Sequence, residues 1–329
     1  MISCTEFIPL YSEFFKFLEK RGGKDAVMNY WIHISDTSIG DRTNPNSLAY
    51  KCERLGGYEG AKAYWGHTLT EEACDLYEIT NDKLKYYYSH MRHCPSRGML
   101  NEICHIEPYH DYCEHCKVIY SRVLQRYGII YERDHSKIDR AECSSILYEK
   151  GNKPSFDYTV PTEDCEVVDL KSEDNKYLHR DFHLLGDNAL KYCGDNFGSS
   201  EVISFLRDFT KTYYAPIIEK IKREGLSAAK AWLERTYELE EASALLHTEM
   251  TDSTLSVTVE RCPAIEYMRS LGKEPSEYFI EETRTVYATI AEEARLSFKL
   301  ISYGTDGEAE FVFEEKMADL LDTNTEKIE

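Results

Sequence analysis

Residues that could bind a metal or act as nucleophiles are concentrated in one stretch of the chain, residues 90–116. Its densest part, residues 105–116, reads HIEPYHDYCEHC. The imidazole and thiol side chains of the stretch are His90, His93, Cys94, Cys104, His105, His110, Cys113, His115 and Cys116. Zinc binds thiolates and imidazoles, and a thiolate beside an imidazole is an activated nucleophile. The stretch therefore predicts a metal site or a thiol active site, and the alternative is a set of inert buried cysteines and surface histidines.

A metal site is the first interpretation. Cys113 and Cys116 have the C-x2-C spacing of a chelating pair. His135 and Cys143 lie on either side of a predicted hairpin turn, where paired strands can bring them together. We predict a metal site with the ligands Cys94, Cys113, Cys116, His135 and Cys143. Soft ligands favour zinc, with iron as the alternative, although no familiar iron–sulfur spacing is present.

Thiol catalysis without a metal is the second interpretation. In it, a cysteine thiolate attacks the substrate, a histidine acts as the base, and a carboxylate carries protons. The candidate side chains are the nucleophiles Cys94 and Cys143, the bases His93 and His135, and the proton carriers Glu142 and Asp111. We favour the metal because several soft ligands are present. The cysteines expected to be buried and inert are Cys4, Cys52, Cys74, Cys104, Cys165 and Cys193.

A second histidine pair lies outside this stretch. His179 and His183 are four residues apart on a predicted helix, with Asp181 between them. That spacing resembles the zinc-binding H-E-x-x-H pattern, but the glutamate beside the first histidine is absent. We favour the alternative that these residues mark a solvated or interdomain helix start.

The overall composition limits the partners. The chain has 329 residues, 42% of them hydrophobic, and a formal net charge of −20. Such an acidic surface repels nucleic acids and anionic membranes, so we expect no nucleic-acid and no membrane partner. The first residues do not resemble a secretory signal, and no apolar run of about 18 residues is present. We expect a cytoplasmic protein with reduced cysteines and a small-molecule substrate or ligand, and we leave a homodimer open.

The chain contains an internal repeat. Residues 57–95 align with residues 225–263 without a gap, and nine positions are identical. The last two identities are Cys94-Pro95 and Cys262-Pro263. An internal match of this length predicts a tandem duplication, in which each copy forms one structural unit.

The second copy lacks most of the candidate ligands. The residues opposite the two cysteines of the C-x2-C pair are Ile280 and Thr283, and Cys143 stands opposite Ala309 or Glu308. The fold therefore tolerates replacement of these cysteines. We interpret the first copy as the one that carries the site and the second as a degenerate copy.

Each copy predicts an α+β unit in which helices pack on a small antiparallel sheet. Amphipathic helices come first, followed by the strand KLKYYYSHMRHC or TLSVTVERC. A helix then begins near Pro108 or Pro275, and a hairpin closes the unit, with Asp306-Gly307 as the turn of the second copy. The predicted domains are 1–150 for the first repeat, 151–184 for a linker and 185–329 for the second repeat.

These motifs resemble the L-2-amino-thiazoline-4-carboxylic acid hydrolase-like family. The matching pieces are SHMRHCP, DYCEHC and ERDHSKIDRAECSSILY in the first copy, and VTVERCP and GTDGEAEFVF in the second. The resemblance places Cys94, Cys113 and Cys143 on recurring cysteines of the family. The sequence departs at Cys116, where the family has an acidic residue, and after Cys143, where Asp-Phe is replaced by Ser-Ser.

Two functions are implied by resemblance. The hydrolase-like family implies a metal- or thiolate-dependent hydrolase that acts on C–N bonds of a small amidine, amide or thiazoline-like molecule. More remotely, the layout is similar to vinyl-reductase-type small-molecule-binding domains, some of which hold zinc through cysteines eight residues apart. His135 and Cys143 have that spacing, with one cysteine replaced by histidine. The alternative function is therefore a non-catalytic small-molecule-binding or sensor protein with a structural zinc.

Overall fold

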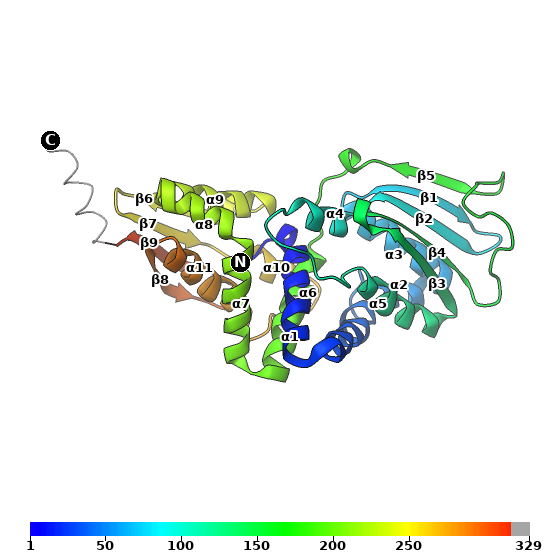
Figure 1. Ribbon diagram of the computed structural model, residues 1–329, viewed down its shortest axis with the longest axis horizontal. Helices are drawn as coiled ribbons and strands as arrows, with labels where there is room; N and C mark the ends of the chain where they lie inside the picture. The colour runs from blue at the N-terminus through cyan, green and yellow to red at the C-terminus, as the bar shows by residue number, and fades with distance from the viewer. Residues whose placement is uncertain (317–329) are drawn as a thin grey trace. The chain divides into compact units, whose positions relative to one another are not determined.

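The computed structural model describes residues 1–316 and has an α+β fold with two antiparallel sheets (Figure 1). The chain divides into two compact units. Residues 11–181 form one of them, which we call the continuous unit. Residues 1–10 and the chain from Phe182 onward form the other, the discontinuous unit. Helix α1 (Phe7–Ile34) begins in the discontinuous unit and ends in the continuous one.

The continuous unit has a five-stranded sheet in the order β3-β4-β2-β1-β5. Its strands are β1 (Asp75–Asn81), β2 (Tyr86–His93), β3 (Ile129–Lys137), β4 (Glu142–Glu149) and β5 (Glu166–Leu170), and its helices after α1 are α2 (Leu48–Leu55), α3 (Gly57–Glu71), α4 (Pro95–Glu102) and α5 (Glu114–Leu124). The ring of Tyr120 on α5 lies 5.9 Å from those of Tyr64 on α3 and Tyr131 on β3, measured between centroids. Buried aromatic side chains therefore join the helices to one face of the sheet.

The discontinuous unit has a four-stranded sheet in the order β6-β7-β9-β8. Its strands are β6 (Leu246–Met250), β7 (Thr254–Val259), β8 (Leu296–Tyr303) and β9 (Ala309–Glu315), and its helices are α6 (Asp181–Phe197), α7 (Ser199–Tyr213), α8 (Ala215–Glu224), α9 (Leu226–Leu239), α10 (Pro263–Ser270) and α11 (Glu281–Glu293). The ring of Tyr287 on α11 lies 5.3 Å from Trp232 on α9 and 6.1 Å from Phe298 on β8. The helices of this unit thus reach their sheet through a similar aromatic group.

The two sheets share one strand order. In chain order, β1, β2, β3 and β4 of the continuous unit correspond to β6, β7, β8 and β9 of the discontinuous unit. With this correspondence, the order β3-β4-β2-β1 becomes β8-β9-β7-β6. Tyr120 and Tyr287 occupy the same place in the two units, on the helix before the closing hairpin. The prediction of two halves, each with helices packed on a small antiparallel sheet, is therefore confirmed.

The segment predicted as a linker, residues 151–184, contains a strand. Within it, β5 pairs antiparallel with β1, from Leu76 opposite Leu170 to Thr80 opposite Glu166. This strand is short and mostly exposed, so its sequence has no strong alternation. The predicted second repeat ends at residue 329, and its last part, residues 317–329, lies outside the described residues.

The helices predicted to begin near Pro108 and Pro275 start later. They begin at Glu114 in α5 and Glu281 in α11, and turns occupy residues 110–113. Two short helices that were not predicted, α4 and α10, instead begin at the prolines of the Cys-Pro pairs, where a missing N–H costs nothing. His110 and Cys113 therefore precede α5, and Cys116 lies within it.

Candidate functional site

Two of the predicted cysteines lie side by side in the continuous unit. Cys94 follows β2, and its backbone N–H donates to the carbonyl of Ala141 at 2.6 Å. Cys143 is the second residue of β4 and stands opposite Met91 of β2. The hairpin turn before β4 is therefore fixed against the end of β2, which places the thiols of Cys94 and Cys143 close enough for each to shift the pKa of the other.

A guanidinium group contacts the same thiol. Side chains alternate along β3, so Arg133 lies on the same sheet face as Tyr131. Its Nη2 donates to Sγ of Cys143 at 3.0 Å, and its Nη1 donates to the hydroxyl of Tyr131 at 3.1 Å. Its Nε is buried and has no hydrogen-bond partner in the part of the chain that the structure describes. A guanidinium stays charged in a protein, so Arg133 is a fixed cation beside Cys143.

These contacts set the protonation of the two thiols. The hydrogen bond from Cys94 and the charge of Arg133 lower the pKa of Cys143 to about 6, against the opposing effect of burial. The same hydrogen bond, together with burial, raises the pKa of Cys94 well above its ordinary value. At neutral pH, Cys143 is therefore the thiolate and Cys94 is the S–H donor.

Cys116 on α5 is a second thiolate candidate. Burial alone would raise its pKa, but the charges of Arg133 and His115 lower it. Nε2 of His115 lies 3.5 Å from Sγ of Cys116, while Nδ1 of the same ring contacts the carbonyl of Tyr112. Cys113 differs, because burial raises its pKa to about 11 and keeps it a thiol.

Cys143 lies at the wall of an open cavity of about 310 Å³. One imidazole and three charged side chains line the same cavity: His90, Asp134, Lys137 and Glu142. Oε1 of Glu142 is 2.5 Å from Nζ of Lys137 and 3.5 Å from Nε2 of His90. The hydrogen bond from Lys137 lowers the pKa of Glu142 and keeps it ionised. A small molecule in this cavity would meet an imidazole, a lysine and carboxylates. The thiol of Cys143 lies on the opposite face of the sheet, with Arg133, because side chains alternate along β4 and His90 pairs with Ser144.

Two of the predicted proton-transfer residues lie away from the cavity. His93 is the last residue of β2, is exposed, and lies 3.5 Å from Glu102. Asp111 is exposed and forms an ion pair of 2.7 Å with Lys24. Neither residue lines the cavity at Cys143. Of the two predicted proton carriers, Glu142 lines this cavity and Asp111 does not.

His135 on β3 contacts the start of helix α5. Its Nδ1 is 3.5 Å from Oε1 of Glu114 at the start of α5. Burial, and then the charge of Arg133, lower its pKa, so the ring is neutral at pH 7. Its Nε2 is buried and has no hydrogen-bond partner among the described residues. His135 could therefore act as a base, although it does not line the cavity at Cys143.

The five predicted metal ligands do not form a compact group. Among the described residues, the group of three whose ligand atoms all lie within 4.8 Å of one another is a different one: Cys4, His183 and Glu240. Around Cys143, a metal ion would also have to share space with the fixed charge of Arg133, 3.0 Å from the sulfur. The zinc site at these five residues therefore stays a prediction, and we derive no chemistry from a metal there.

His179 and His183 belong to different units. Helix α6 begins at Asp181, so only His183 is helical. In the continuous unit, Nδ1 of His179 lies 2.7 Å from Oε2 of Glu71. In the discontinuous unit, Nε2 of His183 lies 3.0 Å from Oε2 of Glu240. The i, i+4 spacing thus gives two separate histidine–glutamate pairs.

Two residues of the cavity region were missed by the sequence analysis as functional residues. Arg133 lies two residues after the buried Tyr131, so the period of a strand would have placed both on the core face. His90 was one of the candidate side chains of residues 90–116, but no role was assigned to it. Its link to Glu142 depends on the pairing of β2 with β4, and no spacing within one segment reveals that pairing.

The discontinuous unit lacks this arrangement of thiols. Its cysteine after β7, Cys262, also donates its backbone N–H to a turn of the closing hairpin, at 2.8 Å. The strand registers place Ala309 at the position of Cys143 and Leu300 at the position of Arg133. Without these partners, burial raises the pKa of Cys262 to about 11. The cysteine after the strand is part of the fold, and the thiolate and its cation are additions in one unit.

Comparisons of the chain with protein-family models, with curated proteins and with solved structures found no match. Within residues 1–316, no helix is long and apolar enough to cross a membrane. The function must therefore be argued from the geometry of the site and from the motif resemblance.

Proposed function

We propose that the continuous unit is a thiol-dependent hydrolase that acts on small amide- or amidine-type molecules. The observation that carries this proposal is the thiol of Cys143, to which Nη2 of Arg133 donates at 3.0 Å and whose pKa is lowered to about 6 by Cys94 and Arg133. A thiolate stabilised by a neighbouring cation is the reactive form of a nucleophilic cysteine. The substrate class comes from the motif resemblance.

The proposed reaction has two steps. The sulfur of Cys143 adds to the amide or amidine carbon, and the C–N bond breaks as the leaving nitrogen takes a proton from a water molecule. The hydroxide that remains attacks the thioester or thioimidate carbon, and the C–S bond breaks to restore the thiolate. His135 lies two residues after Arg133 on β3, and its buried Nε2, which has no hydrogen-bond partner among the described residues, can carry the proton between water and the leaving nitrogen. Cys94 and Arg133 stabilise the thiolate as nucleophile and as leaving group.

Trapping a covalent intermediate tests the proposal. The intact protein is mixed with a panel of small amides, amidines and 2-aminothiazoline carboxylates, quenched with acid and weighed by mass spectrometry. We expect an adduct with the mass of the substrate minus its leaving amine, and peptide digestion should place it on Cys143. If panel members bind to the protein but give neither product nor adduct, the hydrolase proposal is overturned. That result would support the alternative, a non-catalytic small-molecule-binding protein.

The substitution Arg133→Met tests the origin of the thiolate. Loss of an opposite charge at this distance raises a pKa by about 1–3 units. With a rise of about two units, the thiolate fraction of Cys143 at about pH 5.5 falls roughly 80-fold, while each thiolate becomes roughly eightfold more nucleophilic. Alkylation of Cys143 by iodoacetamide should therefore slow about tenfold at that pH and become faster above about pH 8. Peptide mass spectrometry measures the rate at each pH.

Arg122→Met is the matched control for this measurement. Arg122 is a partly exposed arginine on α5 that pairs with Asp36 at 2.8 Å, so its loss should leave the pH profile of Cys143 unchanged. Arg133→Lys keeps a positive charge and should give an intermediate profile. If the alkylation rate of Cys143 in Arg133→Met still has its inflection near pH 6, the guanidinium does not stabilise the thiolate.

A further inference from the structure

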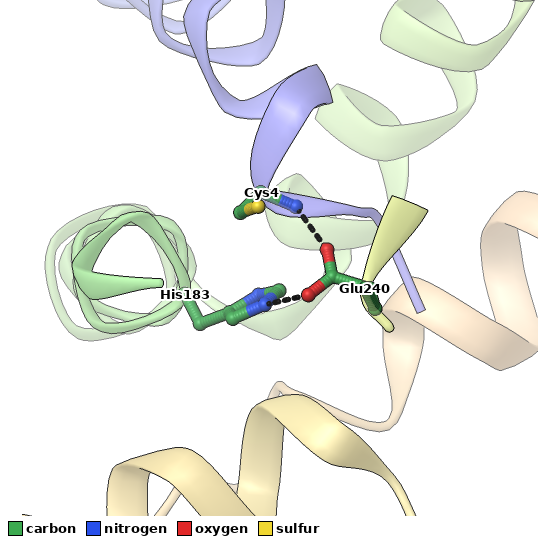
Figure 2. Close-up of side chains that lie close together, drawn as sticks. All are labelled: Cys4, His183 and Glu240. Carbon is green, nitrogen blue, oxygen red and sulfur yellow. Dashed lines mark hydrogen bonds and ion pairs between the residues drawn. The ribbon is translucent and has the colours of Figure 1, made fainter. Parts of the chain in front are cut away.

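Three potential metal ligands meet in the discontinuous unit, whereas the proposed active site belongs to the continuous unit. They are Cys4 in the short helix Cys4–Glu6, His183 in the first turn of α6 and Glu240 at the C-terminal end of α9. Figure 2 shows the carboxylate of Glu240 between the other two residues. One of its oxygens accepts the backbone N–H of Cys4 at 2.6 Å, and the other lies 3.0 Å from Nε2 of His183. One sulfur, one nitrogen and one oxygen ligand atom all lie within 4.8 Å of one another.

The group is closed to solvent. The exposed fractions of Cys4, His183 and Glu240 are 1%, 5% and 2%. Buried charged groups in proteins are paired or bind metal ions. A divalent cation would balance the charges of a Cys4 thiolate and the Glu240 carboxylate and would leave His183 neutral. The site would then carry no net charge, which is the arrangement that burial favours.

We propose that Cys4, His183 and Glu240 bind one zinc ion. Zinc binds sulfur at about 2.3 Å and nitrogen or oxygen at about 2.0–2.2 Å, so its tetrahedral ligand atoms lie roughly 3.4 Å apart. Ligand atoms that already lie within 4.8 Å need only small side-chain shifts to reach this geometry. The second oxygen of Glu240 keeps the N–H of Cys4, the kind of outer contact that orients a ligating carboxylate.

The site has a structural role. Three protein ligands leave a fourth position for a water molecule. Because all three side chains are buried, a substrate cannot reach that position. The ion instead connects the segment before α1, the start of α6 and the end of α9, which are far apart in the sequence. Zinc bound in this way stabilises the folded unit, because the site does not exist in the unfolded chain.

The repeat shows that this ligand set is particular to one unit. Glu72 caps α3 as Glu240 caps α9, and the sequence alignment pairs the two residues. Within residues 1–316, no group of three ligand atoms of this kind includes Glu72. The glutamate therefore belongs to the shared fold, and Cys4 and His183 turn it into a candidate ligand set in the discontinuous unit alone.

Titration with cobalt(II) tests the proposal. Chelator-treated full-length protein without a histidine tag is titrated with Co²⁺, which takes the place of zinc in N/S/O sites and absorbs visibly. We expect about one equivalent to bind and to show a sulfur-to-cobalt charge-transfer band, and Cys4→Ser should abolish that band. His183→Cys should keep the ion and roughly double the band, because a second thiolate joins the site. This second variant keeps the test decisive if Cys4→Ser does not fold.

Matched variants separate this site from other cysteines. Cys193→Ser removes another buried cysteine, on α6, and Glu72→Gln changes the counterpart of Glu240; both should leave the cobalt spectrum unchanged. The proposal is overturned if the protein binds neither Co²⁺ nor Zn²⁺ in competition with a weak chelator. It is also overturned if folded Cys4→Ser keeps the full band. A band lost in Cys116→Ser and Cys143→Ser, but kept in Cys4→Ser, would assign the metal to the continuous unit.

Discussion

The substitution Cys143→Ser is expected to lower the hydrolysis rate of any accepted substrate by at least about 10³-fold. Cys94 and Arg133 stabilise a thiolate whose pKa is about 6. A serine hydroxyl has a far higher pKa, and the same two contacts cannot ionise it at neutral pH. Release of ammonia or amine, followed both in the steady state and in a single turnover, measures the loss.

Two other cysteines provide controls for this prediction. Cys113→Ser changes a cysteine of the same unit whose pKa is raised to about 11 by burial, so it should keep its activity. Cys94→Ser replaces the S–H donor by an O–H donor and should keep most of the rate near neutral pH, because the Cys143 thiolate still receives a hydrogen bond. Unchanged hydrolysis in Cys143→Ser would show that another nucleophile is used, and Cys116 would be the first to test.

The substitution His183→Ala is expected to destabilise the metal-free protein by about 3–5 kcal/mol. The side chains of His183 and Glu240 are 3% and 1% exposed and lie 3.0 Å apart. Removing the imidazole leaves the buried carboxylate of Glu240 without water and with the N–H of Cys4 as its remaining donor, and this poorly compensated burial is the source of the cost. Urea unfolding, read by hydrogen exchange and mass spectrometry so that each unit is followed separately, measures the change in the discontinuous unit.

His179→Ala is the matched control, because His179 also forms a histidine–glutamate pair, and the glutamate of that pair is more accessible to water. Glu71, the partner of His179 at 2.7 Å, has a side chain that is 33% exposed. Water can therefore solvate its carboxylate when the imidazole is lost, and we expect a cost of only about 1 kcal/mol. The double variant His183→Leu with Glu240→Met should recover part of the loss, since it removes both charges. Equal destabilisation by the two single alanine variants would contradict the burial argument.

Local sequence signals predicted much of the fold. Alternating apolar residues predicted β7, and Asp306-Gly307 predicted the turn between β8 and β9. The strand β5 was not predicted, because a short exposed edge strand depends on pairing with β1 more than on its own side chains. The start of α5 was placed too early, because proline is favoured both in turns and in the first turn of a helix.

The candidate sites differ in how far the sequence could predict them. Cys94 and Cys143 were expected to meet because one ends a strand and the other lies beside a hairpin turn, and the structure brings their thiols together. The contact of Cys4 with Glu240 joins residues 236 positions apart, which no spacing or periodicity reveals. Cys4 was therefore expected to be an inert buried cysteine. His183 was recognised as a candidate ligand, but with His179 as its partner.

The order in which the chain is synthesised matters for a protein divided in this way. The residues of the continuous unit, 11–181, leave the ribosome as one uninterrupted segment and hold all five strands of their sheet. Residues 1–10 are made first, yet their partners begin only at Phe182. Closing a flexible loop of that length costs about 4–5 kcal/mol of chain entropy, much of which is already lost once the intervening unit has folded. Until translation passes α9 and β9, Phe7 and Ile8, which are buried in the finished unit, remain apolar side chains exposed to the chaperones around the nascent chain.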